Sequence, residues 1–462
     1  TPSNSSAASD VYKRQGRGRA DGGSGPAVPG TDANMTDIVF ENVRLIDPAS
    51  SRDETGRLVV RQGKIIACED GSVPDGARVI DGAGAVLCPG LVDMRVALGE
   101  PGSEYRESVS SGARAAVAGG ITTMAVLPNT SPPIDNPALV HLLRVRGEET
   151  GMVSIHPYGA LTRGCEGREM AELGLLQEAG AVAFTDGTHA IADAKQMRNL
   201  LSYSRFLDAI VVQHPEEPSL ATGACATAGA RAVRMGLPQV PAEAEAIMIA
   251  RDLRLAEMTK ARLHFAHVST AEGLDLIRQA KSRGVRVTCD TAPPYFAMTE
   301  DDIGDFRTYA KLSPPLRNEA DRKAVCAGLV DGTIDAVASD HAPADADDKR
   351  LPFAQARAGG TGLVTLLGVT LGTGLPLVDA LRLVTSAPAA LLGLKAGTLA
   401  VGSDADLCLF DPEGAWTVVA GDLPGRAQNT PFDGQELKGR VLRTFKRGVE
   451  VFTAAEMAGA PS

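Results

Sequence analysis

The feature that most constrains the fold is an alternation of short apolar runs and longer amphipathic stretches through the middle of the chain. The stretch PAEAEAIMIARDLRLAEMTK, for example, spaces its apolar residues by three and four, as a helix with one buried face does. The short apolar runs are typical of parallel strands buried on both faces. Eight such units in about 250 residues predict an α/β fold, a (β/α)8 TIM barrel. The expected strands are 91–96, 122–127, 153–159, 181–185, 209–214, 263–268, 285–290 and 335–339.

Both ends of the chain carry a different pattern, in which short alternating strands are separated by Gly, Asp and Ser. DIVFENVRLID and GRLVVRQGKIIAC near the start correspond to GSDADLCLFDP and GRVLRTFKRGVEVF near the end. We expect these strands to meet in a small β-sandwich formed by residues 35–88 and 396–455, with the barrel at 89–395. Residues 1–34 are polar and Gly/Ser-rich, and we interpret them as a disordered or artefactual tail. Their segment SSAASDVYKRQ resembles translated adapter sequence, which makes Met35 a candidate natural start.

Composition excludes several classes of function. The net charge of −11 argues against a nucleic-acid-binding surface. The seven cysteines are dispersed and form no CxxC pair, so they are interpreted as reduced thiols of a cytoplasmic protein. No apolar run approaches 18 residues, so no membrane-spanning segment is expected.

Polar side chains recur at the carboxyl ends of the expected strands, where barrels of this kind carry their active sites. A purely structural role does not predict such side chains at the same end of successive strands. His156 and His264, in contrast, fall inside strands and are interpreted as core or packing residues. The candidate site positions are Arg95 and Ala97 on strand 1, Asn129 on strand 2, Asp186 on strand 4, His214 on strand 5, His267 on strand 6, and Asp340 with His341 on strand 8.

Several long motifs, in this order along the chain, resemble the dihydroorotase family of the amidohydrolase superfamily. They include PGLVDM, GGITTMAVLPNTSPPIDN, HFAHVSTAEGLDLIR, KLSPPLR, ASDHAPADADDK and NTPFDGQELKGRV, and the similarity runs from about residue 37 to 453. The resemblance implies a zinc-containing barrel that closes the ring of dihydroorotate in pyrimidine synthesis, or hydrolyses it in reverse.

The first barrel strand departs from the family pattern. Where the family carries His-x-His-x-Arg, this chain has Arg95, Ala97 and Gly99. The resemblance implies that the two lost imidazoles bind metal and that the lost arginine holds the substrate carboxylate. A methyl group offers zinc no lone pair, and a guanidinium only donates and stays charged, so it repels a dication. Without the metal, the attacking water keeps a pKa of about 15.7 instead of about 7.

The remaining family positions are partly kept. His214 and His267 match the histidines of strands 5 and 6, Asp340 matches the proton-handling aspartate, and Asn129 matches a substrate-contacting asparagine. We interpret Asp340 and Asn129 as vestigial. The two histidines have two open interpretations: a residual site for a single zinc ion, with Asp186 or Asp340 as third ligand, or a pair of inherited histidines hydrogen-bonded in the barrel mouth.

Three further positions separate this chain from the family. By spacing, Gly187 rather than Asp186 falls on the position of a metal-bridging aspartate, although one residue of loop slack reverses this assignment. Ser313 stands where the family usually has Asn, and Ala344 where it has His. We therefore expect the site to have lost its catalytic activity while the motifs that determine the fold are kept.

Arg95 has its own expected role. An unpaired buried carboxylate is costly, and a fixed guanidinium offsets that cost. We interpret Arg95 as the ion-pair partner of Asp340 or Asp186, which supplies positive charge where a metal would have done so.

Three functions stay open. The first is favoured because the departures from the family pattern cluster at the metal-binding and catalytic positions. In the first, the chain resembles the non-catalytic branch of the family: it is inactive, needs no cofactor and assembles as an oligomer with the catalytic chain of aspartate carbamoyltransferase, a partner that the resemblance implies. In the second, it hydrolyses dihydroorotate or another cyclic amide with one zinc ion on a remodelled site. In the third, it binds a small molecule and keeps the barrel mouth as a pocket.

Overall fold

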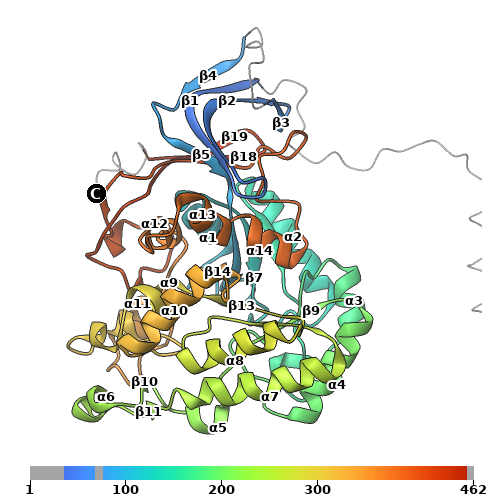
Figure 1. Cartoon of the computed structure of the whole chain (residues 1–462), viewed down its shortest axis with the longest axis vertical. Helices are drawn as coiled ribbons and strands as arrows, with labels where there is room; N and C mark the ends of the chain where they lie inside the picture. The colour runs from blue at the N-terminus through green and yellow to red at the C-terminus, as the bar shows by residue number, and fades with distance from the viewer. Residues whose placement is uncertain (1–35, 68–75, 455–462) are drawn as a thin grey trace, which may run out of the picture. The chain divides into compact units, whose positions relative to one another are not determined.

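The computed structural model describes residues 36–67 and 76–454, so the tail expected at 1–34 lies outside the described residues. Strands from both ends of the chain form one sheet in the order β19-β18-β15-β5-β1-β2-β3, with β4 paired to β1 (Figure 1). These strands are β1 (Ile38–Asp47), β2 (Arg52–Arg61), β3 (Lys64–Ala67), β4 (Arg78–Asp81), β5 (Val86–Pro89), β15 (Leu407–Asp411), β18 (Arg440–Lys446) and β19 (Val449–Thr453).

The sheet curls around an apolar core of its own. Phe40 on β1 and Phe445 on β18 meet edge to face, with ring centroids 5.0 Å apart, although their strands are not neighbours in the sheet. Arg78 on β4, which pairs with β1, also forms an ion pair of 2.6 Å with Glu450 on β19, the strand at one end of the sheet order. The predicted β-sandwich made from both chain ends is therefore confirmed, while the exact domain boundaries stay a prediction.

The middle of the chain forms the predicted barrel of parallel strands. The strands are β6 (Leu91–Val96), β7 (Ile121–Val126), β8 (Ser154–Pro157), β9 (Ile210–Gln213), β12 (Arg262–Phe265), β13 (Val287–Thr291) and β14 (Ala336–Val337). They pair as β6-β7-β8 and as β9-β12-β13-β14.

Single bridges close the ring between these two groups of strands. Phe184 pairs in parallel with Gly159 and Val211, so the strand expected at 181–185 is reduced to one bridging residue. On the other side, Val96 pairs in parallel with His341. The (β/α)8 barrel predicted from the sequence is confirmed.

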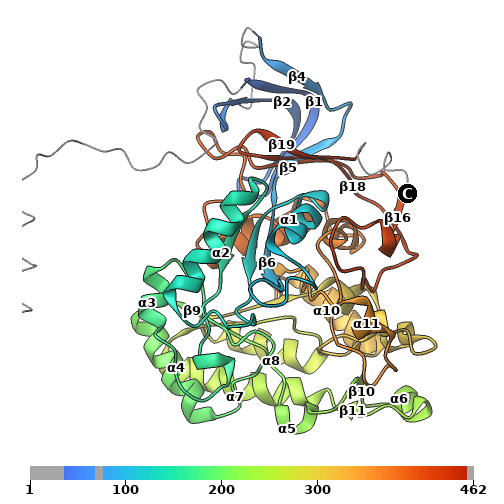
Figure 2. The ribbon, with the colours of Figure 1, turned by 180° about the vertical axis from the view of Figure 1, so that it is seen from behind.

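Helices cover the outside of the barrel (Figure 2). The longer ones are α1 (Val109–Ala118), α2 (Pro137–Thr150), α4 (Ala194–Phe206), α7 (Glu243–Thr259), α8 (Ala271–Ser282) and α10 (Glu319–Asp331). The shorter ones are α3 (Leu173–Glu178), α5 (Pro218–Ala221), α6 (Ala230–Met235), α9 (Pro293–Ala297), α11 (Ala346–Arg350), α12 (Leu366–Leu371), α13 (Leu377–Leu383) and α14 (Ser386–Leu392). Two short strand pairs, β10 (Ala226–Thr227) with β11 (Gln239–Val240) and β16 (Trp416–Thr417) with β17 (Glu436–Leu437), lie in the loops.

Local sequence fixes where several of these helices begin and end. Ser108 caps α1 through the backbone N–H of Ser111, and Asn136 caps α2 in front of a proline at the first helical position. Gly151 ends α2 in the left-handed conformation that glycine adopts most easily. None of the helices in residues 36–67 and 76–454 has both the length and the apolar character needed to cross a bilayer.

Candidate functional site

A cavity of about 70 Å³ opens at the carboxyl ends of the barrel strands. Its walls include side chains from strands 1, 5, 6 and 8 of the barrel, as the sequence predicts for an active site of this fold. Arg95, His214, His267 and Asp340 all line it, and Ala97 lies beside them. His341 lines the cavity too, so the structure brings six of the predicted positions together.

Arg95 and Asp340 form the central ion pair of this site. Arg95 is the fifth residue of β6, and only 2% of its side chain is exposed. Its Nε donates to Oδ1 of Asp340 at 2.8 Å, and its Nη2 donates to the backbone oxygen of Gly187 at 3.2 Å. Burial alone would raise the pKa of Asp340, but the charges and hydrogen bonds of His267 and Arg95 outweigh it and hold the pKa well below its usual range. Asp340 is therefore ionised, and of the two carboxylates proposed for Arg95 it is the one that pairs.

The two histidines continue this pair into a hydrogen-bonded chain. Nδ1 of His267 lies 3.0 Å from Oδ2 of Asp340, and Nε2 of His267 lies 2.7 Å from Nδ1 of His214. Burial, aided by the charge of Arg95, lowers the pKa of His267 to about 4, so the ring is neutral near pH 7. Because Asp340 can only accept, Nδ1 of His267 carries the proton, and Nε2 must accept the N–H of His214.

The backbone is strained at His267 and Asp340. His267 has φ of 41° and Asp340 has φ of 51°, both in the left-handed region that non-glycine residues rarely adopt. Such strain costs on the order of 1–3 kcal/mol for each residue and is concentrated at functional sites. The barrel mouth therefore keeps the backbone geometry of a site.

Glu216 adds a further member to this hydrogen-bonded series of side chains, one that the sequence analysis did not identify. Its Oε2 lies 3.5 Å from Nε2 of His214, and only 15% of its side chain is exposed. Burial acts to raise the pKa of Glu216, but the hydrogen bond and charge of His214 outweigh it and lower the pKa. The only available signal was its place two residues after His214 in HPEEP.

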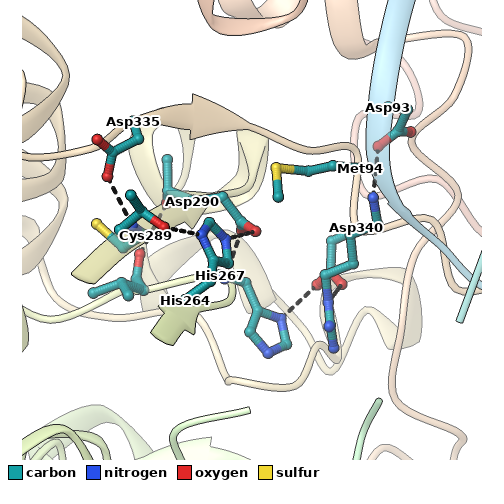
Figure 3. A network of polar contacts seen from close by, with 12 residues as sticks. Asp93, Met94, His264, His267, Cys289, Asp290, Asp335 and Asp340 are labelled. Atoms are coloured by element: carbon teal, nitrogen blue, oxygen red, sulfur yellow. Dashed lines mark hydrogen bonds and ion pairs between the residues drawn. The ribbon is translucent and has the colours of Figure 1, made fainter. Parts of the chain in front are cut away.

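A second polar layer lies directly beneath the site in the barrel interior (Figure 3). Asp290 accepts the backbone N–H of His267 at 2.7 Å, and its other oxygen lies 2.9 Å from Nε2 of His264. Asp93 accepts the backbone N–H of Arg95 at 3.2 Å and is fully buried. Burial raises the pKa of Asp93 to about 7. This layer holds the backbones of both Arg95 and His267 in place.

Asp186 and Asn129 are not part of this row of hydrogen-bonded side chains. The carboxylate of Asp186 accepts the backbone N–H of Thr162 at 2.9 Å and also the hydroxyl of Thr162. Asn129 donates from Nδ2 to the backbone oxygen of Asp186 at 2.9 Å and accepts the N–H of Thr188 at 3.2 Å. Their hydrogen bonds hold the loop after strand 4, where Nδ2 of Asn129 also lies 3.4 Å from Nδ1 of His189.

Two glycines mark positions where a family side chain has no room. A Cβ on Gly187 would lie 1.4 Å from Oδ1 of Asn129, so Asn129 occupies the space of a carboxylate at 187. A Cβ on Gly99 would lie 2.0 Å from the backbone oxygen of Ser103. An arginine at 99 would therefore require the backbone of its loop to move, whereas an aspartate at 187 would require the side chain of Asn129 to leave its place.

The other departures from the family lie around the cavity. Ser313 lines it, whereas Ala344 is buried and donates its N–H to Oδ1 of Asn429 at 3.1 Å.

The side chains at the barrel mouth do not fit a zinc ion in this arrangement. Zinc needs free lone pairs from at least three protein ligands. Nε2 of His267 is used by His214, both oxygens of Asp340 are used by Arg95 and His267, and a fixed guanidinium charge lies alongside. Within the described ranges, no group of three or more His, Cys, Asp or Glu side chains is arranged to hold a metal ion.

Comparisons with known proteins connect this geometry to a family. A family model described as dihydro-orotase-like matches residues 84–273. Dihydroorotase from Pelobacter propionicus is 43% identical over 420 residues, which cover 90% of this chain and 99% of the relative. Dihydroorotase from Syntrophotalea carbinolica is 42% identical over 415 residues, which cover 89% and 98%.

Solved structures show the same fold at lower identity. L-hydantoinase from Arthrobacter aurescens superposes with a TM-score of 0.80 at 27% identity, covering 91% of this chain and 96% of that protein. D-hydantoinase from Thermus sp. superposes with a TM-score of 0.78 at 23% identity, covering 90% and 95%, a likeness of fold alone.

Proposed function

The chain belongs to the dihydroorotase-like family of the amidohydrolase superfamily, and we propose that it serves pyrimidine biosynthesis as a catalytically inactive member. We propose further that it acts as a structural partner of the catalytic chain of aspartate carbamoyltransferase, within an oligomer. No resident cofactor is part of this proposal.

The observation that carries the proposal is the ion pair between Arg95 and Asp340. The position of the family's first metal-binding imidazole holds a buried guanidinium, whose Nε lies 2.8 Å from the carboxylate that handles protons in the family. A carboxylate held by a fixed cation is a poor proton acceptor, because its pKa is lowered. With Ala97 and Gly99 beside it, the site lacks both the activated water and the clamp that ring hydrolysis uses.

The persistence of the scaffold supports a structural role. The barrel and the sandwich are complete, and relatives about 40% identical align over nearly their full length. A chain that has lost its chemistry and kept its fold is expected to act through its surface.

The deciding experiment is co-expression of the tagged full chain with the aspartate carbamoyltransferase catalytic chain of the same organism. We expect the two to co-elute in size-exclusion chromatography, and the catalytic chain to lose this assembly when the present chain is omitted. Ring closure of carbamoyl aspartate by the purified chain should stay at the uncatalysed rate, with the Pelobacter propionicus relative assayed in parallel as a positive control. Separate elution of the two chains would refute the partnership, and turnover would refute inactivity.

Restoring the two imidazoles tests the role of Arg95 directly. The double variant Arg95→His/Ala97→His removes the cation beside Asp340, so it should be less stable than the unchanged chain in metal-free buffer. It should also remain inactive with added zinc, because Gly99 and Gly187 are unchanged. Equal stability of the two proteins in metal-free buffer would contradict the role assigned to Arg95.

A second candidate is a cyclic amidohydrolase that uses one zinc ion. The closeness of His214, His267 and Asp340 is what supports it, because two imidazoles and one carboxylate form an accepted ligand set. It requires the hydrogen bonds among these three side chains to open, because their lone pairs are otherwise used. Elemental analysis of the purified chain separates the candidates. One zinc per chain, with turnover abolished in His267→Ala, would establish this second function and overturn the first.

A further inference from the structure

The outer side of the barrel carries three large apolar side chains in solvent, on the neighbouring helices α3 and α4. Leu175 of α3 is 51% exposed, and Tyr203 and Phe206 of α4 are 40% and 84% exposed. Phe206 is the most exposed large apolar side chain in the described ranges. Single exposed apolar residues are common, whereas a group of them marks a surface that meets a partner. We call the surface formed by these three residues the α3–α4 face.

Contacts between the two helices make this face continuous. Nε2 of Gln177 on α3 donates to the backbone oxygen of Leu207, the residue that ends α4, at 3.3 Å. A Cβ on Gly174 of α3 would lie 3.4 Å from the hydroxyl oxygen of Tyr203, so this side chain reaches across to α3. The ribbon shows α3 beside α4 on the outside of the barrel from both directions (Figures 1 and 2). The apolar side chains of both helices therefore belong to one preformed surface.

Charges of opposite sign lie on the two sides of the α3–α4 face. Glu178 is the last residue of α3 and Arg205 the penultimate residue of α4; both are exposed. Among the described residues, neither forms a hydrogen bond or an ion pair through its side chain. The charge of Arg205 helps to lower the pKa of Asp208, but the carboxylate of Asp208 bonds to Arg286 instead. Within their bounds, the charged residues of α3 are only acidic and those of α4 only basic.

This arrangement makes the face complementary to itself. In a dimer with a two-fold axis every contact occurs twice, so Glu178 of one copy meets Arg205 of the other, and the reverse. The apolar side chains of the two copies then cover each other between these pairs. The net charge of −11 makes two copies repel each other overall, so association is favoured only where opposite charges meet.

We propose that two copies of this chain associate through the α3–α4 face about a two-fold axis, with Phe206 at the centre of the contact and a Glu178–Arg205 pair on each side. The proposal does not rest on the proposed function, because this contact needs neither turnover nor a different partner chain. The three residues of the face do not line the cavity at the barrel mouth, so that cavity stays outside the contact.

Sedimentation equilibrium of the purified full chain alone, at pH 7 and low salt, tests the proposal. We expect a reversible dimer, and in Phe206→Glu a dissociation constant at least about tenfold higher. Val330→Glu is the matched control, because Val330 on α10 is 71% exposed and lies outside the face; it should leave the dimer unchanged. A monomeric unchanged chain, or equally tight dimers of the unchanged chain and Phe206→Glu, would overturn the proposal.

A charge exchange tests the two-fold pairing. Glu178→Arg and Arg205→Glu each place like charges opposite one another, so each should weaken the dimer about tenfold. The double variant Glu178→Arg/Arg205→Glu restores opposite charges at both contacts and should recover most of the affinity. A double variant as weak as the single ones would overturn the arrangement. Loss of co-elution with the aspartate carbamoyltransferase chain in Phe206→Glu, with self-association unchanged, would assign the face to that partner and overturn the proposal.

Discussion

Two buried ion pairs of this molecule differ in how completely their hydrogen bonds are satisfied. Where the sheet meets the barrel, Lys446 donates to Asp406 at 2.6 Å, to the hydroxyl of Ser154 at 2.8 Å and to the backbone oxygen of Thr122 at 3.2 Å. All three protons of its ammonium group are used. At the barrel mouth, Arg95 leaves Nη1 unpaired.

The difference separates a structural pair from a site. A buried charge that only supports the fold gains most when every donor and acceptor is satisfied, because each unpaired group carries a desolvation cost. Lys446 meets this condition and Arg95 does not.

The largest loss of stability is expected when the pair of Lys446 and Asp406 is broken. Lys446→Met removes three hydrogen bonds and leaves the carboxylate of Asp406, which is 15% exposed and bonded to the backbone N–H of Arg447, without its cation, so the free energy of unfolding should fall by about 3–5 kcal/mol. Lys438→Met is the matched control, because Lys438 pairs with Glu413 at 2.7 Å but both side chains are exposed. That control should lose less than about 1 kcal/mol in urea denaturation at pH 7. Equal losses in the two variants would show that the buried pair has no special weight.

The mouth pair should contribute less. In Arg95→Met, Asp340 keeps its hydrogen bond to His267 and is 20% exposed, so we expect a loss of about 2–3 kcal/mol. The double variant Arg95→Met/Asp340→Asn removes the uncompensated charge and should recover at least half of that loss. Urea denaturation of Arg95→Met, of Asp340→Asn and of the double variant gives the coupling energy between the two residues. Additive losses would mean that Arg95 stabilises the fold by packing rather than by charge.

The regular parts of the molecule could be predicted from the sequence, because their signals are local. The first barrel strand was expected at 91–96, and β6 occupies that range. The strand at 181–185 had the same apolar signal but became a single bridge at Phe184, because only pairing with its neighbours decides strand length. The acidic segment 340–349 leads into α11, and Lys349 of that helix is buried against three backbone oxygens, a placement with no local sequence signal.

The sequence predicted which residues form the site better than it predicted which of them bond to each other. The ion pair of Arg95 with Asp340 was one of two expected alternatives. Asp186 could not be excluded, because the direction of a side chain after a strand end depends on the loop, and here Thr162 binds it. The junction pair of Lys446 and Asp406 had no sequence signal at all, since its other two acceptors lie some 300 residues earlier in the chain.

The junction should also respond to acid. Burial, with the nearby charges of Lys446 and Arg144, lowers the pKa of His156 on β8 to about 4. The unfolded chain binds this proton near pH 6.5 and the folded chain does not, so stability falls as the pH drops from about 6.5 toward 4. We expect His156 to account for about 1–2 kcal/mol of the difference between pH 8 and pH 5. Urea denaturation of the unchanged chain and of His156→Gln at both values measures this; parallel pH profiles would contradict it.

The smallest effect concerns the position of a metal-bridging carboxylate. Gly187 and Gly151 both have φ of 65°, but a Cβ at 187 would collide with Asn129, whereas a Cβ at 151 would meet nothing within 4 Å. Both Gly→Ala variants should lose about 1 kcal/mol from the left-handed backbone. Gly187→Ala should lose up to about 1 kcal/mol more, because Asn129 must give up its two backbone hydrogen bonds.

Adding Asn129→Ala to each glycine variant isolates that contact. In the Asn129→Ala background, the two Gly→Ala changes should have equal effects in urea denaturation, because the obstacle at 187 is gone. If Gly187→Ala instead equals Gly151→Ala in the unchanged chain, Asn129 moves aside freely. The bridging position would then be open to a carboxylate, and Arg95 alone would separate this mouth from a metal-binding one.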